Sequence, residues 1–160
     1  DALGAGVPGV SYNCQGILRS SDYAHWERVR EEPLLAPDER QDWGTIRHSA
    51  VHVRDPRMFD VYYSTRTGPD LQREVLRMAH VDASVPPSQW QAEKLGTVLE
   101  PELEWERVGW VPNVVFSCGQ VVAGGVVYVY YGAADTSICS ARAKGIEIRV
   151  STAVARKMPR

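Results

Sequence analysis

Residues 110–143, WVPNVVFSCGQVVAGGVVYVYYGAADTSICSARA, constrain the fold of this chain more than any other stretch. Three runs of mainly β-branched and aromatic residues, at 111–116, 126–131 and 137–141, are separated by glycines. Short runs of this composition predict antiparallel strands of a meander. Asn113 is expected inside the first strand and Asp135 in the turn after the second. These two residues are therefore the polar exceptions in an otherwise apolar sheet.

A second block with the same pattern precedes this stretch. Strands are expected at 46–53, 59–65, 73–81 and 90–99, with a turn at 54–57 (RDPR). A helix remains the alternative for residues 70–80, whose apolar positions also fit a helical stripe. Val61-Tyr62-Tyr63 in this block corresponds to Val129-Tyr130-Tyr131 in the other. Repeated four-stranded antiparallel units are typical of a β-propeller, in which each blade packs against its neighbours.

The sequence thus predicts an all-β fold, a partial β-propeller of about two and a half blades. A single domain would contain a half blade at 12–45, a blade at 46–99 and a blade at 111–151. Propellers close with roughly 4 to 8 blades. The chain would therefore be a piece of a longer protein, or it would pair with a copy of itself. We expect a homodimer, in which a second chain completes the ring.

Composition narrows the possible partners. The net charge of −2 and the pI near 6.1 disfavour nucleic acid. No apolar run reaches the roughly 18 residues of a membrane-spanning helix, so no membrane partner is expected. Cys14, Cys118 and Cys139 lack metal-ligand spacing, and buried free thiols in a cytoplasmic protein are expected, with a disulfide as the alternative. The spacing of His25, His52 and His80 predicts no metal site.

Two segments carry a resemblance to a known family. Residues 105–119 (WERVGWVPNVVFSCG) and 127–143 (VYVYYGAADTSICSARA) resemble the closing part of glycoside hydrolase family 130, the mannoside phosphorylases and related mannosidases. Upstream, residues 20–29 (SSDYAHWERV) resemble a segment that precedes this part in the family. Residues 43–64 are similar to the wider clan of five-bladed propeller glycosidases. The resemblance implies an oligosaccharide ligand and inorganic phosphate as a possible co-substrate, with no other cofactor.

The resemblance also implies roles for particular residues. Asp135 matches an aspartate that binds the sugar, and Glu106 matches a glutamate near the substrate. Asn113 would lie in a strand that faces the propeller axis. Tyr62 loosely matches the tyrosine of a YHG motif, although Tyr63 stands where the family has histidine. The family's general acid and phosphate-binding arginines lie upstream of the matched part. The DPR at 55–57 falls in a predicted turn and is not taken as that acid's motif.

Glycoside cleavage needs a proton donor and a second group on the other side of the bond, and both are commonly carboxylates. Asp135 and Glu106 are the candidate catalytic residues, while Arg47 and His48 on an inner strand are expected to reach a central pocket. Each has a structural alternative: Asp135 as a turn former, Glu106 as a solvated charge and His48 as a core residue. The aromatic rings suited to a sugar's C–H face are Trp105, Trp110 and Tyr130.

Two functions therefore remain open. In the first, the chain is a glycoside hydrolase or phosphorylase, or part of one. The substrate-binding set is then Arg47, His48, Tyr62, Glu106, Asn113 and Asp135. In the second, the chain is a non-catalytic, propeller-derived module that binds a sugar or a protein and lacks the upstream acid.

Overall fold

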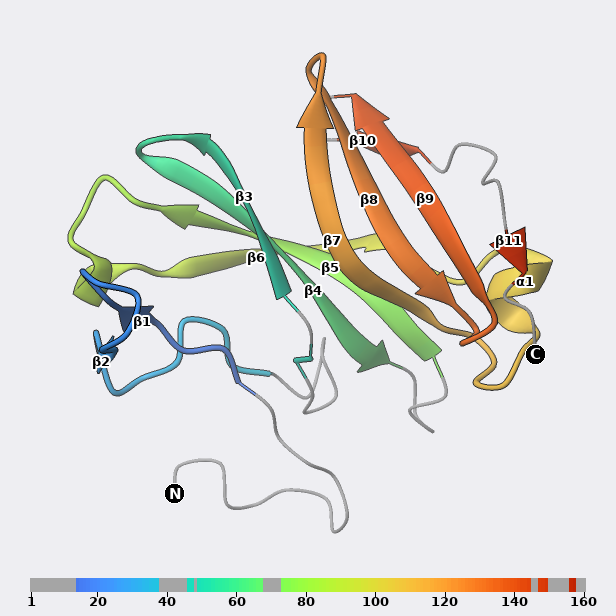
Figure 1. The fold of residues 1–160 in the computed structure, drawn as a ribbon, viewed down its shortest axis with the longest axis horizontal. Coiled ribbons are helices and arrows are strands. Elements are labelled where there is room, and N and C mark those ends of the chain that lie inside the picture. The colour runs from blue at the N-terminus through green and yellow to red at the C-terminus, as the bar shows by residue number, and fades with distance from the viewer. Residues whose placement is uncertain are drawn as a thin grey trace, which may run out of the picture.

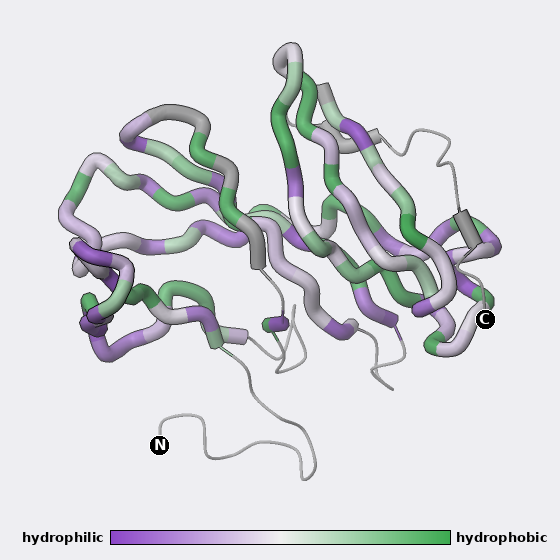
Figure 2. Tube along the Cα trace, viewed as in Figure 1, coloured by the Kyte–Doolittle hydropathy of each residue, from purple (hydrophilic) through white to green (hydrophobic). Residues whose placement is uncertain are grey.

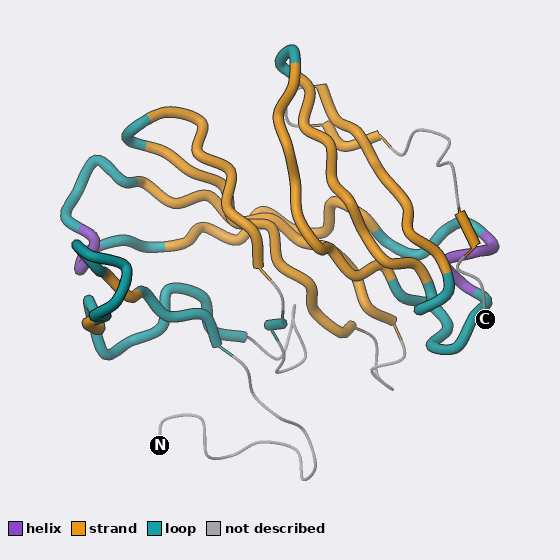
Figure 3. The backbone as a smooth tube through the Cα atoms, in the orientation of Figure 1, coloured by secondary structure: helices purple, strands orange, loops and turns teal. Residues whose placement is uncertain are grey.

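The computed structural model describes residues 14–37, 46–47, 49–67, 73–144, 147–149 and 156–157. Strands make up almost all of its regular structure (Figure 3). Two antiparallel sheets, β3-β4-β5-β6 and β10-β9-β8-β7, follow each other along the chain, and a short β1-β2 hairpin precedes them (Figure 1). The prediction of an all-β, partial-propeller fold is confirmed. No helix in these ranges is long and apolar enough to span a membrane.

The first sheet contains the predicted strands. Residues 73–82 form a strand paired with β4 on one side and β6 on the other, so the helical alternative is wrong. Most of its residues are buried, and they project to both faces. A strand covered on both faces lacks the alternation that distinguishes it from a buried helix, which explains the ambiguity. The elements are β3 (Ser49–Asp55), β4 (Met58–Thr67), β5 (Arg73–Asp82), η1 (Pro87–Gln89) and β6 (Ala92–Leu99).

The second sheet begins later than predicted. Its first strand starts at Val115, so the expected strand at 111–116 and the placement of Asn113 inside it are wrong. Pro112 has no N–H to donate to a ladder, and Asn113 adopts a left-handed φ of 59°. The strands are β7 (Val115–Ala123), β8 (Val126–Ala133), β9 (Ser137–Lys144), β10 (Glu147–Arg149) and β11 (Arg156–Lys157), with β11 paired to β9.

The main core lies between the two sheets. Tyr62, Leu76 and Met78 from the first sheet pack with Val129 and Tyr131 from the second. The opposite face of the first sheet is also covered, because Leu35 and Ile46 pack on the side of Tyr63. Adjacent residues of a strand point to opposite faces, so the Tyr62-Tyr63 pair contributes one ring to each core.

The outer face of the second sheet is not covered by any described segment. Tyr130, Ile138 and Val121 share this face through the strand register and are 47%, 56% and 47% exposed. Figure 2 shows hydrophobic stretches continuing along β7 and β8. In a propeller each blade packs on both faces. This face is therefore an exposed and partly apolar sheet surface.

The N-terminal segment forms a small hairpin, β1 (Leu18–Arg19) and β2 (Glu27–Arg28). Its turn is fixed by Asp22, whose Oδ1 accepts the backbone N–H groups of Ala24 and His25 at 2.9 and 2.8 Å. The hydrogen bond from the His25 side chain holds the pKa of Asp22 below its usual range. The three cysteines are unpaired; Cys139 is buried, but Cys118 is exposed, which corrects the expectation that all three are buried.

Candidate functional site

The residues that carry the motif resemblance are joined by backbone hydrogen bonds. The Ala134 N–H donates to the Val114 carbonyl at 3.1 Å, and the Val111 N–H donates to the Ala134 carbonyl at 3.3 Å. The loop at 108–114 therefore lies directly against the β8-β9 turn. Gly109 permits this approach, because a Cβ there would stand 2.2 Å from the Ala134 carbonyl oxygen. Two segments about twenty residues apart in sequence thus form one rigid corner.

The β8-β9 turn has an unusual backbone. Ala134 and Asp135 both have positive φ, at 45° and 55°, and the Thr136 N–H donates to the Ala133 carbonyl at 3.0 Å. Two consecutive left-handed residues match a type I′ hairpin turn, which normally contains asparagine or glycine. Such strain persists where the surrounding structure enforces it, and it is found most often at functional sites. Here the turn presents Asp135 at the surface, while Ala134 is fully buried.

Asn113 links this corner to the first sheet. Its carbonyl accepts the backbone N–H of Glu74 at 2.9 Å, and Glu74 forms a parallel bridge with Val114. The start of β5 is therefore pinned beside the start of β7. The structure thus brings Asn113 and Asp135, which the sequence analysis selected, next to Glu74, which it did not.

Glu74 gathers two arginines at the same edge. Its Oε2 lies 3.8 Å from Nη1 of Arg47 and 3.7 Å from Nε of Arg66. Arg47 precedes β3, and its N–H donates to the Ser64 carbonyl at 2.8 Å. The start of β3, the end of β4 and the start of β5 lie at one end of the first sheet, near the β8-β9 turn (Figure 1). Arg47 is a predicted site residue, whereas Arg66 and Glu74 were missed.

Burial is the main influence on the pKa of Glu74. This side chain is almost completely inaccessible, and desolvation raises its pKa above the ordinary value for glutamate. The charges of Arg47 and Arg66 oppose this rise, and the Asp135 carboxylate adds to it. The influence of Asp135 shows that the two carboxylates are electrostatic neighbours. The site therefore combines two carboxylates with two guanidinium groups.

Glu106 occupies a different environment. It lies in α1 (Glu104–Arg107), is fully buried, and both of its carboxylate oxygens accept hydrogen bonds. Oε1 accepts from the Tyr131 hydroxyl at 2.6 Å, and Oε2 accepts the backbone N–H groups of Glu102 and Leu103 at 2.8 Å each. The alternative of a solvated charge is wrong. The carboxylate holds α1 and the following loop in place, and it is not at the surface with Asp135.

The remaining candidates do not gather at this corner, apart from Trp110. Tyr62 is buried in the core between the sheets, and Trp105 packs against that core. Tyr130 lies on the outer face of the second sheet. Trp110 is 79% exposed and directly precedes Val111, so it stands beside the β8-β9 turn. His48 lies outside the described residues.

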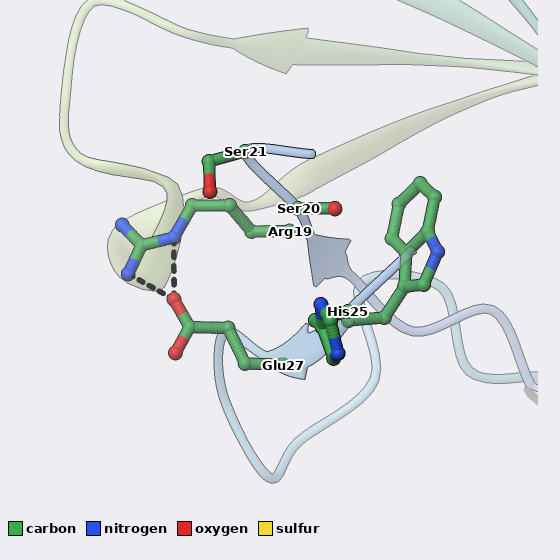
Figure 4. Close-up of a pocket in the computed structure, with 6 residues that line it drawn as sticks. Arg19, Ser20, Ser21, His25 and Glu27 are labelled. Atoms are coloured by element: carbon green, nitrogen blue, oxygen red, sulfur yellow. Dashed lines mark hydrogen bonds and ion pairs between the residues drawn. The ribbon is translucent and has the colours of Figure 1, made fainter. Parts of the chain in front are cut away.

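A surface depression occurs elsewhere, on the β1-β2 hairpin (Figure 4). Its wall includes the exposed Arg19–Glu27 ion pair and the ring of Trp26. None of the predicted site residues line it. Within the part of the chain that the structure describes, no cluster of three or more histidine, cysteine, aspartate or glutamate side chains could hold a metal ion.

The corner at Asn113 and Asp135 lies in a part of the chain that matches a known protein family. Residues 89–149 match the family model of glycoside hydrolase family 130, described as β-1,4-mannooligosaccharide phosphorylase. The comparisons support a family 130 assignment for this part of the chain. The matched range includes Asn113 and Asp135, together with the loop and turn that position them.

Two similar proteins come from Thermoanaerobacter sp. (strain X514). The chain is 56% identical over 52 residues to a 1,2-β-oligomannan phosphorylase and 60% identical over 52 residues to a β-1,2-mannobiose phosphorylase. Each alignment covers 32% of this chain, and 18% and 17% of the relatives. A β-1,2-mannobiose phosphorylase from Listeria innocua is 30% identical over 107 residues, which are 67% of this chain and 29% of that protein. The chain thus spans well under two thirds of the relatives it matches.

Solved structures agree on the fold. A β-1,2-mannobiose phosphorylase from Listeria innocua, in complex with β-1,2-mannobiose, superposes with a TM-score of 0.69 at 25% identity. The match covers 87% of this chain and 38% of that one. A glycosyl hydrolase from Bacteroides ovatus gives a TM-score of 0.62 at 19% identity, over 86% of this chain and 41% of that one. The family 130 resemblance therefore extends to both sheets.

Proposed function

We propose that this chain forms one side of a mannoside phosphorylase site, in which Asp135 binds a mannose unit and phosphate is the second substrate. One observation carries the proposal: the loop 108–114 and the β8-β9 turn present Asp135 at the surface, close enough to Glu74 for its charge to act on that carboxylate. Carboxylates and amides suit paired sugar hydroxyls, and exposed Trp110 suits the C–H face of a sugar ring. The named activities of the relatives identify mannosides as the first compounds to test.

Asp135 is the candidate catalytic residue that the geometry favours over Glu106. Its side chain is exposed, whereas both oxygens of Glu106 are bonded inside the protein. A group that protonates a glycosidic oxygen must reach it at hydrogen-bond distance. Asp135 satisfies this requirement of access, and Glu106 supports the loop that positions it.

The direct test uses the full chain with β-1,2- and β-1,4-mannobiose, with and without phosphate. Phosphate-dependent release of mannose 1-phosphate supports the proposal, and release of mannose by water alone would instead indicate a hydrolase. Asp135→Asn is expected to abolish turnover or binding while keeping the turn, because asparagine also tolerates left-handed φ. Asp82→Asn, at an exposed strand end, is the matched control and should behave like the parent.

The second candidate, a sugar-binding module without catalysis, is favoured by one specific observation. Of the two candidate acids, Glu106 is enclosed in the protein and only Asp135 reaches the surface. Calorimetric binding of mannobiose that depends on Asp135, without any turnover, would select this function. If neither turnover nor binding occurs, both candidates are wrong.

We also propose that a second copy of the chain covers the outer face of the second sheet. The exposed Tyr130 and Ile138 supply an apolar surface of the kind that blades bury against each other. Light scattering should then give twice the chain mass of 17.8 kDa, and Ile138→Asp should shift it toward monomer. Val53→Asp, on the first sheet and 66% exposed, is the matched control. A stable monomer of the parent would remove this proposal.

A further inference from the structure

The β1-β2 hairpin carries the depression that Figure 4 shows in close-up, which has a volume of about 480 Å³. Binding sites for small molecules commonly have volumes of about 300–1,000 Å³. In Figure 1 the hairpin and the β8-β9 turn lie on opposite sides of the molecule, so the depression is separate from the corner at Asp135. The residues that line it are Arg19, Ser20, Ser21, His25, Trp26 and Glu27.

The carboxylate of Asp22 fixes the orientation of the His25 ring in this lining. Oδ2 of Asp22 lies 2.6 Å from Nδ1 of His25, while Oδ1 accepts the His25 backbone N–H at 2.8 Å. The side-chain hydrogen bond lowers the pKa of Asp22, so the carboxylate is ionised at neutral pH and Nδ1 is the donor. Nε2 of the neutral ring is then a hydrogen-bond acceptor. The His25 side chain is 89% exposed, so this acceptor is available to a ligand.

The charged side chains that line the depression balance each other. Nε of Arg19 donates to Oε1 of Glu27 at 2.8 Å, and Nη2 of Arg19 contacts the same oxygen. Oε2 of Glu27 takes no part in this ion pair and can accept the hydroxyl of a ligand. One paired cation and one paired anion leave no excess charge to attract an ionic ligand. The depression therefore suits a neutral molecule with several hydroxyl groups.

An aromatic residue completes the lining. Trp26 is 55% exposed, so part of its large apolar side chain is open to a ligand. Tyr23, in the adjoining turn, is 88% exposed and has a left-handed φ of 60°, which is rare for a bulky residue. The hydrogen bonds from the Ala24 and His25 N–H groups to Asp22 hold the turn in this geometry. An aromatic ring beside hydroxyl-binding groups suits a pyranose, which has an apolar C–H face and a polar edge.

We propose that this depression is a second saccharide site, which binds a neutral oligosaccharide with one sugar ring against Trp26 and hydroxyls bonded to His25 and Glu27. The site lies outside the corner that the proposed function uses, and it requires neither Asp135 nor phosphate. A saccharide bound only here contacts no candidate catalytic residue, so it is held without being cleaved. This site goes beyond the proposed function and does not depend on it.

Calorimetry with β-1,4-mannotetraose and with cellotetraose tests this site. Asp135→Asn serves as the background, because it removes the contribution of the corner, and it should still bind at least one of the two tetramers. Adding Trp26→Ala should weaken this binding about ten-fold, whereas Trp26→Phe keeps an aromatic face and should retain most of the affinity. Arg28→Ala, exposed on β2 but outside the lining, is the matched control and should bind like the background.

His25→Ala gives an independent variant in the same background. The ring is so exposed that its removal takes no packing from the core, and loss of one hydrogen bond should weaken binding about three-fold. Tetragalacturonate, an acidic tetramer, tests whether the ligand is neutral, and it should bind more weakly than the neutral tetramers. Circular dichroism of each variant checks that the fold is retained.

Three results would overturn the inference. The first is that the background binds neither neutral tetramer. The second is binding that both Trp26→Ala and His25→Ala leave unchanged, because the sugar would then lie elsewhere. The third is tighter binding of tetragalacturonate, which would indicate an acidic ligand. Failure of mannoside turnover in the parent, with normal Trp26-dependent binding, would contradict only the proposed function.

Discussion

The hydroxyl of Tyr131 donates a 2.6 Å hydrogen bond to Oε1 of Glu106, and so ties the middle of the second sheet to α1. The other oxygen of Glu106 accepts two backbone N–H groups from the segment that leads into α1. Burial and the neighbouring Glu106 raise the pKa of Tyr131, so the phenol remains a hydrogen-bond donor at any ordinary pH. Since the loop 108–114 follows α1 directly, this buried bond supports the corner that carries Asp135.

Replacing Glu106 by alanine should therefore destabilise the fold strongly. The change removes three hydrogen bonds to a buried carboxylate and leaves their donors unsatisfied, at a cost of about 3 kcal/mol. Urea denaturation measures this loss in the free energy of unfolding. Glu104→Ala, exposed on the same helix, should change it by less than about 0.5 kcal/mol. Similar values for the two variants would show that Glu106 has no structural role.

Gly109→Ala tests the contact between the loop and the β8-β9 turn. The new methyl would meet the Ala134 carbonyl oxygen at 2.2 Å and the Ala134 Cβ at 2.7 Å, so the turn must shift. The expected loss is about 1–3 kcal/mol of unfolding free energy, typical of overpacking, together with weaker sugar binding. Gly119→Ala has no atom within 4 Å of its new methyl and should leave both quantities near the parental values.

Glu74→Gln should change how stability depends on pH. The folded-state pKa of Glu74 is raised, so between the unfolded value, about 4.3, and the folded value the native state binds more protons than the unfolded state. The parent should therefore lose stability as pH rises through this window. The stability of Glu74→Gln relative to the parent should grow over the same window and then level off. Urea denaturation at several pH values measures the difference in unfolding free energy between the two proteins. A difference that does not vary with pH would contradict the raised pKa of Glu74.

Much of the fold could be predicted because it depends on local composition. Most of the strands from β3 to β9 lie where apolar, β-branched or aromatic runs occur between glycines, prolines and turn residues, and Pro56 and Arg57 of the RDPR segment form the turn between β3 and β4. The failures have local causes. Pro112 and the left-handed Asn113 delay the start of β7, although the residues that follow the proline look like a strand.

The candidate site was only partly predictable because its other half is assembled by tertiary contacts. Asp135 could be selected because a carboxylate stands alone between two apolar strands. Glu74 and Arg66 carry no such signal, since both look like ordinary charges at strand ends. Their place at this corner follows only from tertiary contacts. The Glu74 N–H donates to the Asn113 carbonyl, and the buried Glu74 side chain faces Arg47 and Arg66. Glu106 is the opposite case: the sequence motif selects it as a site residue, but both of its carboxylate oxygens accept hydrogen bonds inside the protein.

The paired left-handed residues at Ala134 and Asp135 also bear on the order of folding. A hairpin closed by alanine and aspartate has little intrinsic preference for this geometry, unlike one closed by asparagine and glycine. The two backbone hydrogen bonds that join Ala134 to Val111 and Val114 must form before this turn geometry becomes favourable. A nascent or partly unfolded chain would therefore not hold the Asp135 carboxylate in a fixed position. A ligand that needs this carboxylate would bind only the fully folded protein.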